Sequence, residues 1–143
     1  MSPYNWSVFV THGDEIRMSH VNLRRSQAKP APTPDAGPIA RLDAGFRPLV
    51  DARWEVRTRF GSTQAEQALA RSAWNAQDLA FFRWFADVPA FDGVTSGSEC
   101  VWFRDLRFET PGRGRIPFRF AVCRDGPDDR WRLKHGAGAD EPR

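Results

Sequence analysis

The stretch from residue 99 to residue 134 constrains the fold most, because it reads as three consecutive β-strands. The three β-like segments are residues 99–109, 116–124 and 130–134, and glycine-containing turn sequences separate them. In the middle segment every second residue from Ile116 to Val122 is large and apolar, which assigns one face of that strand to a core. Short turns between neighbouring strands predict an antiparallel sheet.

The N-terminal part of the chain predicts a β-hairpin followed by a long loop. Residues 6–11 and 15–23 are rich in β-formers, and Gly13 between them can take the positive φ that a tight turn needs. From residue 24 to residue 48 periodicity is lost and prolines accumulate, which predicts a Pro-rich loop within the domain. Residues 50–60 fit a strand or a short helix equally well, and a further short strand is expected near residues 91–95.

Two helices are expected in the centre of the chain. Thr63 and Glu66 have the spacing of a capping box, which predicts a helix that begins there and ends near Trp74. A second helix, ending before Pro89, carries a broad apolar stripe that we expect to pack in the core, made of Phe81, Trp84, Phe85 and Val88 and extended by Phe82.

Together these segments predict one soluble α+β domain. We expect residues 1–136 to form a mainly antiparallel sheet of about five or six strands, with two central helices packed on one face, and residues 137–143 to be a flexible tail. A chain of 143 residues is long enough to bury such a core.

Composition argues against several classes of function. The 21 basic and 18 acidic residues are interspersed, so no basic stripe indicates nucleic-acid binding. No apolar stretch approaches the ~20 residues that span a bilayer, so we expect no direct membrane insertion by this fragment. Two cysteines, Cys100 and Cys123, are too few for a zinc site, and we expect them to pack as small apolar residues. If their strands are neighbours, a disulfide between them is the alternative.

No catalytic site, metal site or cofactor site can be recognised in the fragment. His12, His20 and His135 lie in unrelated segments without ligand spacing, and no serine stands in a nucleophile elbow. The most specific local feature is Asp105 within an apolar strand, two residues before Arg107. A half-buried carboxylate needs a cationic partner, and we expect either Arg107 or an arginine of the preceding helix.

Two interpretations of this charged group stay open. In the structural one, an ion pair of Asp105 fixes strand and helix in register. In the functional one, an anion- or ligand-binding site is built from four residues: Arg83, Asp105, Arg107 and Arg119.

Three segments carry a resemblance to a known family. They are residues 81–89 (Phe-Phe-Arg-Trp-Phe-Ala-Asp-Val-Pro), 102–108 (Trp-Phe-Arg-Asp-Leu-Arg-Phe) and 117–120 (Pro-Phe-Arg-Phe), and the opening residues 2–6 add to them. Together they resemble the C-terminal soluble region of predicted bacterial membrane-bound metal-dependent hydrolases, the LexA-binding, inner-membrane-related family. The Pro-rich segment 24–48 has no counterpart in that pattern.

The resemblance implies a larger parent protein. Proteins of that family carry their membrane helices and their His/Asp metal motif in the N-terminal half, so no catalytic or metal residue carries over to this chain. The fragment would then be a soluble accessory or recognition domain, associated with the bacterial inner membrane through its parent membrane domain and able to meet a protein partner. The alternative is a self-contained small-anion or small-ligand binding domain, or an enzyme, that uses the Arg/Asp cluster.

Overall fold

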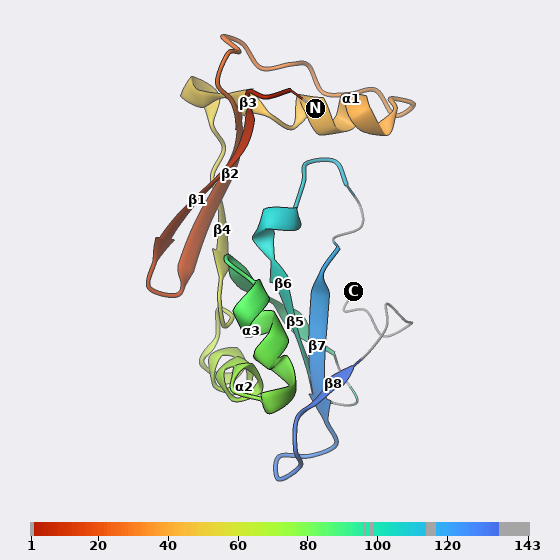
Figure 1. The fold of residues 1–143 in the computed structure, drawn as a ribbon. Helices are drawn as coiled ribbons and strands as arrows, with labels where there is room; N and C mark the ends of the chain where they lie inside the picture. Colours follow the sequence, from red (N-terminus) through yellow and green to blue (C-terminus); the bar gives the residue numbers. More distant parts are fainter. Residues whose placement is uncertain (1, 96, 98, 114–116, 135–143) are drawn as a thin grey trace. The chain divides into compact units, whose positions relative to one another are not determined.

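A computed structural model describes residues 2–95, 97, 99–113 and 117–134. The chain divides into two compact units (Figure 1), which we call unit 1 and unit 2. Unit 1 comprises residues 1–57 and 108–117, and unit 2 comprises residues 58–107 and 118–143. The assignment of residues 1–136 to one domain stays a prediction, and the tail 137–143 lies outside the described residues.

Unit 1 is built on the expected N-terminal hairpin. Strands β1 (Asn5–His12) and β2 (Glu15–Asn22) pair antiparallel along their whole length, and Gly13 has a φ of 59° in the two-residue turn. β2 also pairs in parallel with β3 (Arg47–Pro48) and pairs with β4 (Glu55–Thr58), which completes a four-stranded sheet. The ambiguous segment 50–60 therefore contains a strand, preceded by the 3₁₀ helix η1 (Leu49–Asp51).

The Pro-rich segment 24–48 is more ordered than a long loop. It contains helix α1 (Pro38–Ala44), which begins at a proline suited to the first helical turn, and it ends in β3. Arg25 donates hydrogen bonds to the carbonyls of Asp43 and Phe46, each at 2.7 Å, and its guanidinium pairs with the Asp43 carboxylate at 2.6 Å. These bonds satisfy carbonyls at the end of α1, so a single arginine ties the segment together.

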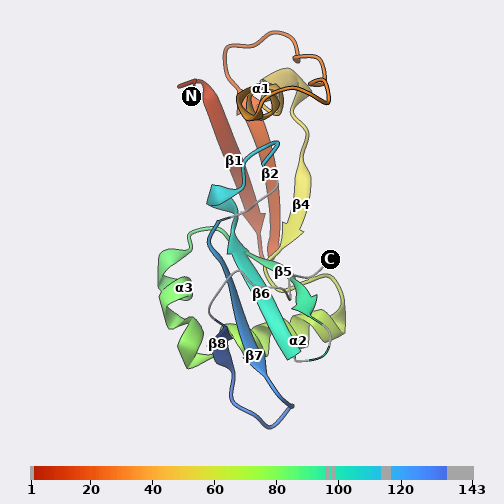
Figure 2. The ribbon, with the colours of Figure 1, turned by 90° about the vertical axis from the view of Figure 1, so that its right-hand side faces the viewer.

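Unit 2 combines two helices with a second four-stranded sheet (Figure 2). Helix α2 (Gln64–Trp74) begins at Thr63 with the predicted capping box, and the 3₁₀ helix η2 (Gln77–Leu79) leads into α3 (Ala80–Phe85). The strands follow in the order β5-β6-β7-β8, all antiparallel. They are β5 (Pro89–Thr95), β6 (Glu99–Asp105), β7 (Arg119–Arg124) and β8 (Arg132–Lys134).

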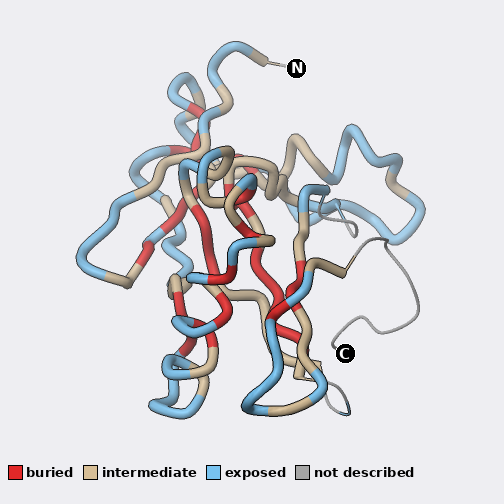
Figure 3. The backbone as a smooth tube through the Cα atoms, turned by 60° about the horizontal axis from the view of Figure 1, so that its bottom comes forward, coloured by how far each residue is buried: buried red, intermediate tan, exposed pale blue. Residues whose placement is uncertain are grey.

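The core of unit 2 lies between its helices and its sheet. Phe82 of α3 and Phe103 of β6 are 1% and 0% exposed, and their ring centroids are 6.4 Å apart. Phe120, opposite Phe103 in the sheet, is only partly buried and packs on Phe82. Figure 3 marks the buried positions of the chain in red.

The α+β class and the mostly antiparallel strands are confirmed, but the finer architecture differs from the prediction. The structure has two sheets of four strands rather than one sheet of five or six, and a third helix, α1, lies in unit 1. The two predicted helices therefore do not cover one central sheet. Strand patterns do not specify strand partners, and here the hairpin pairs with residues 47–48 and 55–58 instead of with the C-terminal strands.

Three local expectations also change. Of the apolar stripe expected in the core, Phe82 is buried, but Phe81 and Trp84 lie on the outer side of α3 and are 59% and 78% exposed. The strand predicted over residues 99–109 ends at Asp105, where the chain turns into the 3₁₀ helix η3 (Leu106–Phe108). Cys100 and Cys123 face each other across β6 and β7 and form a disulfide, where unpaired packing was the expectation. The sequence left this pairing open because it depends on which strands are neighbours.

Candidate functional site

Asp105 forms an ion pair with Arg107, one of the two cationic partners expected for it. Its carboxylate is fully buried and accepts hydrogen bonds from Nε and Nη2 of Arg107, at 2.8 and 2.6 Å. It also accepts from the backbone N–H groups of Arg107 and Asp87. The hydrogen bond to Asp105 raises the pKa of Arg107 above its usual value. Because η3 turns directly after Asp105, Arg107 folds back over the preceding strand end.

The other two residues of the predicted Arg/Asp cluster have different partners. Arg83 donates through Nη1 to the carbonyls of Trp74 and Ala76, beside the C-terminal end of α2. Arg119 pairs with Asp92 at 2.5 Å and stacks over Trp102. The structure thus brings Asp105 and Arg107 together, and it gives Arg83 and Arg119 separate structural roles within unit 2.

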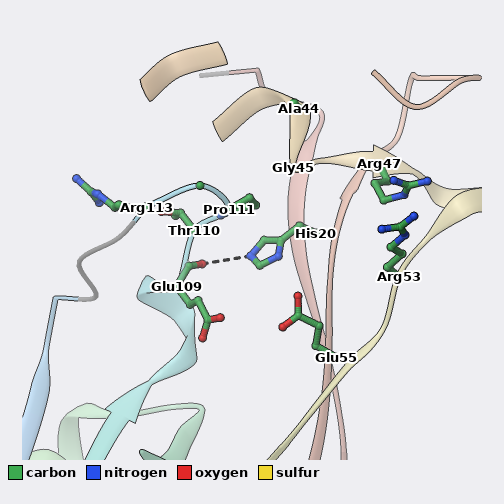
Figure 4. Close-up of a pocket in the computed structure, with 11 residues that line it drawn as sticks. His20, Ala44, Gly45, Arg47, Arg53, Glu55, Glu109, Thr110, Pro111 and Arg113 are labelled. Atoms are coloured by element: carbon green, nitrogen blue, oxygen red, sulfur yellow. Dashed lines mark hydrogen bonds between the residues drawn. The ribbon is translucent and has the colours of Figure 1, made fainter. Parts of the chain in front are cut away.

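A cleft of about 480 Å³ lies in unit 1 (Figure 4). Its charged and titratable lining comes from four separate segments of the chain. These residues are His20, Arg47, Arg53, Glu55, Glu109 and Arg113.

The sheet of unit 1 explains why these residues converge. His20 lies on β2, and β3 pairs with β2 so that Arg47 stands opposite Val21, next in sequence to His20. Glu55 opens β4, which pairs with the same strand. The loop 109–113 closes the cleft, where Nε2 of His20 donates to the carbonyl oxygen of Glu109 at 3.2 Å. β2 is therefore the common support of the site.

Two glycines allow the walls of the cleft to approach each other. A side chain at Gly45 would collide with Pro111, and Gly112 has a φ of 70° with Arg41 against the position of a Cβ. Both positions need a residue without a side chain, because the end of α1 and the loop 109–113 pass so close together. These glycines are the only sequence signal for the cleft that we can identify.

The carboxylates of the cleft already have a cation. Arg57 donates through Nη2 to Glu55 at 2.6 Å and to Glu109 at 3.1 Å. Burial acts to lower the pKa of Arg57, but its hydrogen bond to Glu55 and the charge of Glu109 raise the pKa above the usual arginine value. Arg57 therefore stays charged and neutralises much of the acidic lining.

The arginines of the cleft lack such compensation. Arg53 and Arg113 are exposed, and the guanidinium group of neither forms a hydrogen bond or an ion pair that the described part of the chain shows. Arg47 donates through Nε to the backbone carbonyl oxygen of Asp51, and this uncharged acceptor does not neutralise the guanidinium group. With Arg57 counted, four guanidinium groups face two carboxylates, so the cleft has a positive excess suited to an anionic group.

The remaining candidate chemistry is sparse. Among the described residues, no three His, Cys, Asp or Glu side chains are grouped so that they could hold a metal ion. His12 is exposed at the end of β1, and His135 lies outside the described residues. The prediction that this chain holds no metal or cofactor stays a prediction.

The fold and the cleft define the chain as an α+β protein with an arginine-lined cleft. No protein-family model, curated protein or solved structure matches the chain. In the described residues, no helix combines the length and apolar character needed to cross a membrane.

Proposed function

We propose that this chain is a recognition module that binds an anionic group in the cleft of unit 1. One observation carries the proposal: the two carboxylates of the cleft are held by Arg57, while Arg53 and Arg113 are exposed without an acidic partner among the described residues. Exposed arginines at a concave site suit the bidentate recognition of a carboxylate or a phosphate group.

The size of the cleft fits a small ligand or the charged end of a larger one. Its volume of about 480 Å³ lies within the range of ordinary ligand sites, which is about 300–1,000 Å³. In Figure 4, Arg47 and Arg53 lie together on one side of His20, and Arg113 lies on the other side. An anion with two charged groups would therefore find a cation at each end of the site.

The sequence resemblance supports a wider setting for this module. In that setting the chain is a non-catalytic accessory domain of a membrane-bound predicted metal-dependent hydrolase, located at the bacterial inner membrane through its parent. The paired charges around Asp105 support this hypothesis over a catalytic Arg/Asp cluster, because Arg107, Arg83 and Arg119 each hold structural partners. The cleft would then present an acidic group of a substrate or of a partner protein to the parent.

Calorimetric titration at low ionic strength tests the proposal, with inorganic phosphate and succinate as separate probes. We expect Arg53→Gln and Arg113→Gln each to weaken the binding of at least one probe about tenfold, equivalent to about 1.4 kcal/mol. Arg17→Gln is the matched control, because it removes the same charge from β2 at a side chain that is 59% exposed and bonded to Glu15 outside the cleft.

The control separates site binding from general charge attraction. If all three variants lose the same affinity, the anion senses only the net charge of the protein and the cleft is not its site. If neither probe binds the unmodified protein, the recognition proposal fails for small carboxylates and phosphates.

A further inference from the structure

Strand β1 forms an open edge of the sheet in unit 1 (Figure 2). Within the described part of the chain it pairs only with β2, in a register that runs without a bulge from Asn5↔Asn22 to His12↔Glu15. An edge of this kind presents a row of free backbone N–H and C=O groups, which an extended strand can pair with.

This edge lacks the features that normally prevent such pairing. The sequence of β1, Asn-Trp-Ser-Val-Phe-Val-Thr-His, contains no Lys, Arg, Asp, Glu, Pro or Gly. The two edges of the other sheet are protected: β5 begins at Pro89 and has an irregular register between Phe91 and Val94, and β8 has only three residues, two of them cationic. On the other side of the unit 1 sheet, β3 has two residues and β4 is charged, so among the described strands only β1 is a long uncharged edge.

The hairpin turn determines which backbone groups of β1 point outward. In a two-residue turn the closing pair, here His12 and Glu15, exchanges both backbone hydrogen bonds, and such pairs then alternate along the ladder. Trp6, Val8 and Val10 therefore bond to β2. The outward N–H and C=O groups belong to the alternate residues Asn5, Ser7, Phe9 and Thr11, and of these the N–H of Asn5 already donates to the carbonyl oxygen of Ser2 at 3.2 Å.

The outward groups and the exposed side chains of β1 are self-complementary. A second β1 placed antiparallel about a two-fold axis at Val8 sets Ser7 opposite Phe9 and Asn5 opposite Thr11, so outward groups meet outward groups. The same axis sets Trp6 opposite Val10 of the second copy and Val8 opposite itself. Trp6 and Val10 are 54% and 51% exposed, and both would lie in the closely spaced, non-hydrogen-bonded pairs, where side chains make most contact.

We propose that β1 pairs antiparallel with β1 of a second copy of this chain, about a two-fold axis through Val8. The unit 1 sheet of each copy has four strands, and the pairing joins these two copies of the sheet into one continuous sheet across the dimer. A second copy fits better than an unrelated strand because this register covers two large exposed side chains on each copy at once. Since β1 carries no carboxylate, ammonium or guanidinium group, the isologous contact brings no like charges together.

Sedimentation equilibrium with charged variants of Val8 tests the pairing and its register. Val8→Lys and Val8→Glu should each weaken the dimer at least tenfold, about the effect of a modest like-charge contact at the axis. Because residue 8 faces residue 8, an equimolar mixture of the two variants should recover dimers. A mixture that stays monomeric would overturn the two-fold axis at Val8.

Two further variants complete the test. Val56→Lys introduces the same charge at a valine of β4 that is 54% exposed, and it should leave the dimer intact. Ser7→Pro removes an outward N–H that does not bond to β2. The variant should therefore weaken the dimer and leave the circular dichroism spectrum unchanged. If the Val8 variants do not fold, Ser7→Pro decides whether β1 pairs with β1. An unmodified protein that is monomeric up to about 0.5 mM, or a dimer broken by Val56→Lys but not by Ser7→Pro, would overturn the proposal.

Discussion

The two units use arginine in different ways. In unit 2, Asp105, Asp92 and Glu99 each pair with an arginine of the same unit, and the Asp105 carboxylate is completely buried. In unit 1, Arg25 and Arg57 have carboxylate partners, but Arg53 and Arg113 line an open cleft without one among the described residues. An arginine-rich composition therefore does not indicate a function by itself. Only the arginines that the fold leaves uncompensated are candidates for binding a ligand.

The largest effect should come from the core of unit 2. Phe103→Ala should lower the free energy of unfolding by about 3–5 kcal/mol, because the ring is fully buried against Trp74 and Phe82. Urea denaturation provides the measurement. The control is Trp84→Ala, at a residue that is 78% exposed, which should change the free energy of unfolding by no more than about 0.5 kcal/mol. Equal losses for the two variants would mean that the core of unit 2 is wrongly placed.

The next effect concerns the charge that unit 2 buries. Asp105→Asn should cost about 2–4 kcal/mol of unfolding free energy, somewhat below a fully buried pair because Arg107 is 33% exposed and keeps Asp87 as a partner. Chemical denaturation of Asp87→Asn is the matched control, since Asp87 binds the same guanidinium but is 71% exposed. If Asp105→Asn lowers the free energy of unfolding no more than Asp87→Asn does, the Asp105 carboxylate is not needed for the fold and becomes a candidate for ligand binding.

A smaller, pH-dependent effect should come from the paired charges of unit 1. Hydrogen bonds from Lys29 and then Arg25 lower the pKa of Asp43 from 3.8 to about 2. The carboxylate is therefore more acidic in the folded chain, so its stabilisation is present above about pH 4 and is lost as the pH falls towards 2. We expect a loss of about 1 kcal/mol over this range, since the pair is partly exposed. The pH dependence of unfolding of Asp43→Asn should lack this component, and an unchanged profile would contradict the assignment.

The smallest effect is expected at the cleft. Arg53→Gln should change the unfolding free energy by no more than about 0.5 kcal/mol, because no described residue depends on its charge. Thermal and urea unfolding of this variant, measured without added anions, checks the expectation. A loss of 2 kcal/mol or more, on the order of the Asp105 effect, would show that Arg53 has a structural partner and would remove the contrast between the units.

Local patterns predicted much of the secondary structure. The capping box at Thr63 and Glu66, the turn at Gly13 and the separation of two residues between Asp105 and Arg107 are all interactions between near neighbours in the chain. Their geometry depends on spacing alone, so the sequence is enough to predict them. The helix in the Pro-rich segment was missed because its contacts, from Arg25 to Asp43 and Phe46, span about twenty residues.

Strand pairing and the candidate site could not be predicted in the same way. The cleft joins residues of β2, β3, β4 and the loop 109–113, and His20 and Glu109 are 89 positions apart. No periodicity or motif connects such segments, because any of several strand partners would satisfy the same alternating pattern. The predicted cluster of Arg83, Asp105, Arg107 and Arg119 instead separates into three sets of contacts: Asp105 with Arg107, Arg83 with backbone carbonyls, and Arg119 with Asp92.

The preferences of neighbouring residues are enough to predict the α+β class, the antiparallel hairpins, the capped helix and the need of Asp105 for a cation. Tertiary packing is responsible for three other outcomes: the strands form two sheets, Cys100 meets Cys123, and Arg53 and Arg113 line a cleft whose carboxylates Arg57 already holds. These outcomes depend on which distant segments pack together. Long-range packing decides which charges are paired, and thus which remain available to a ligand.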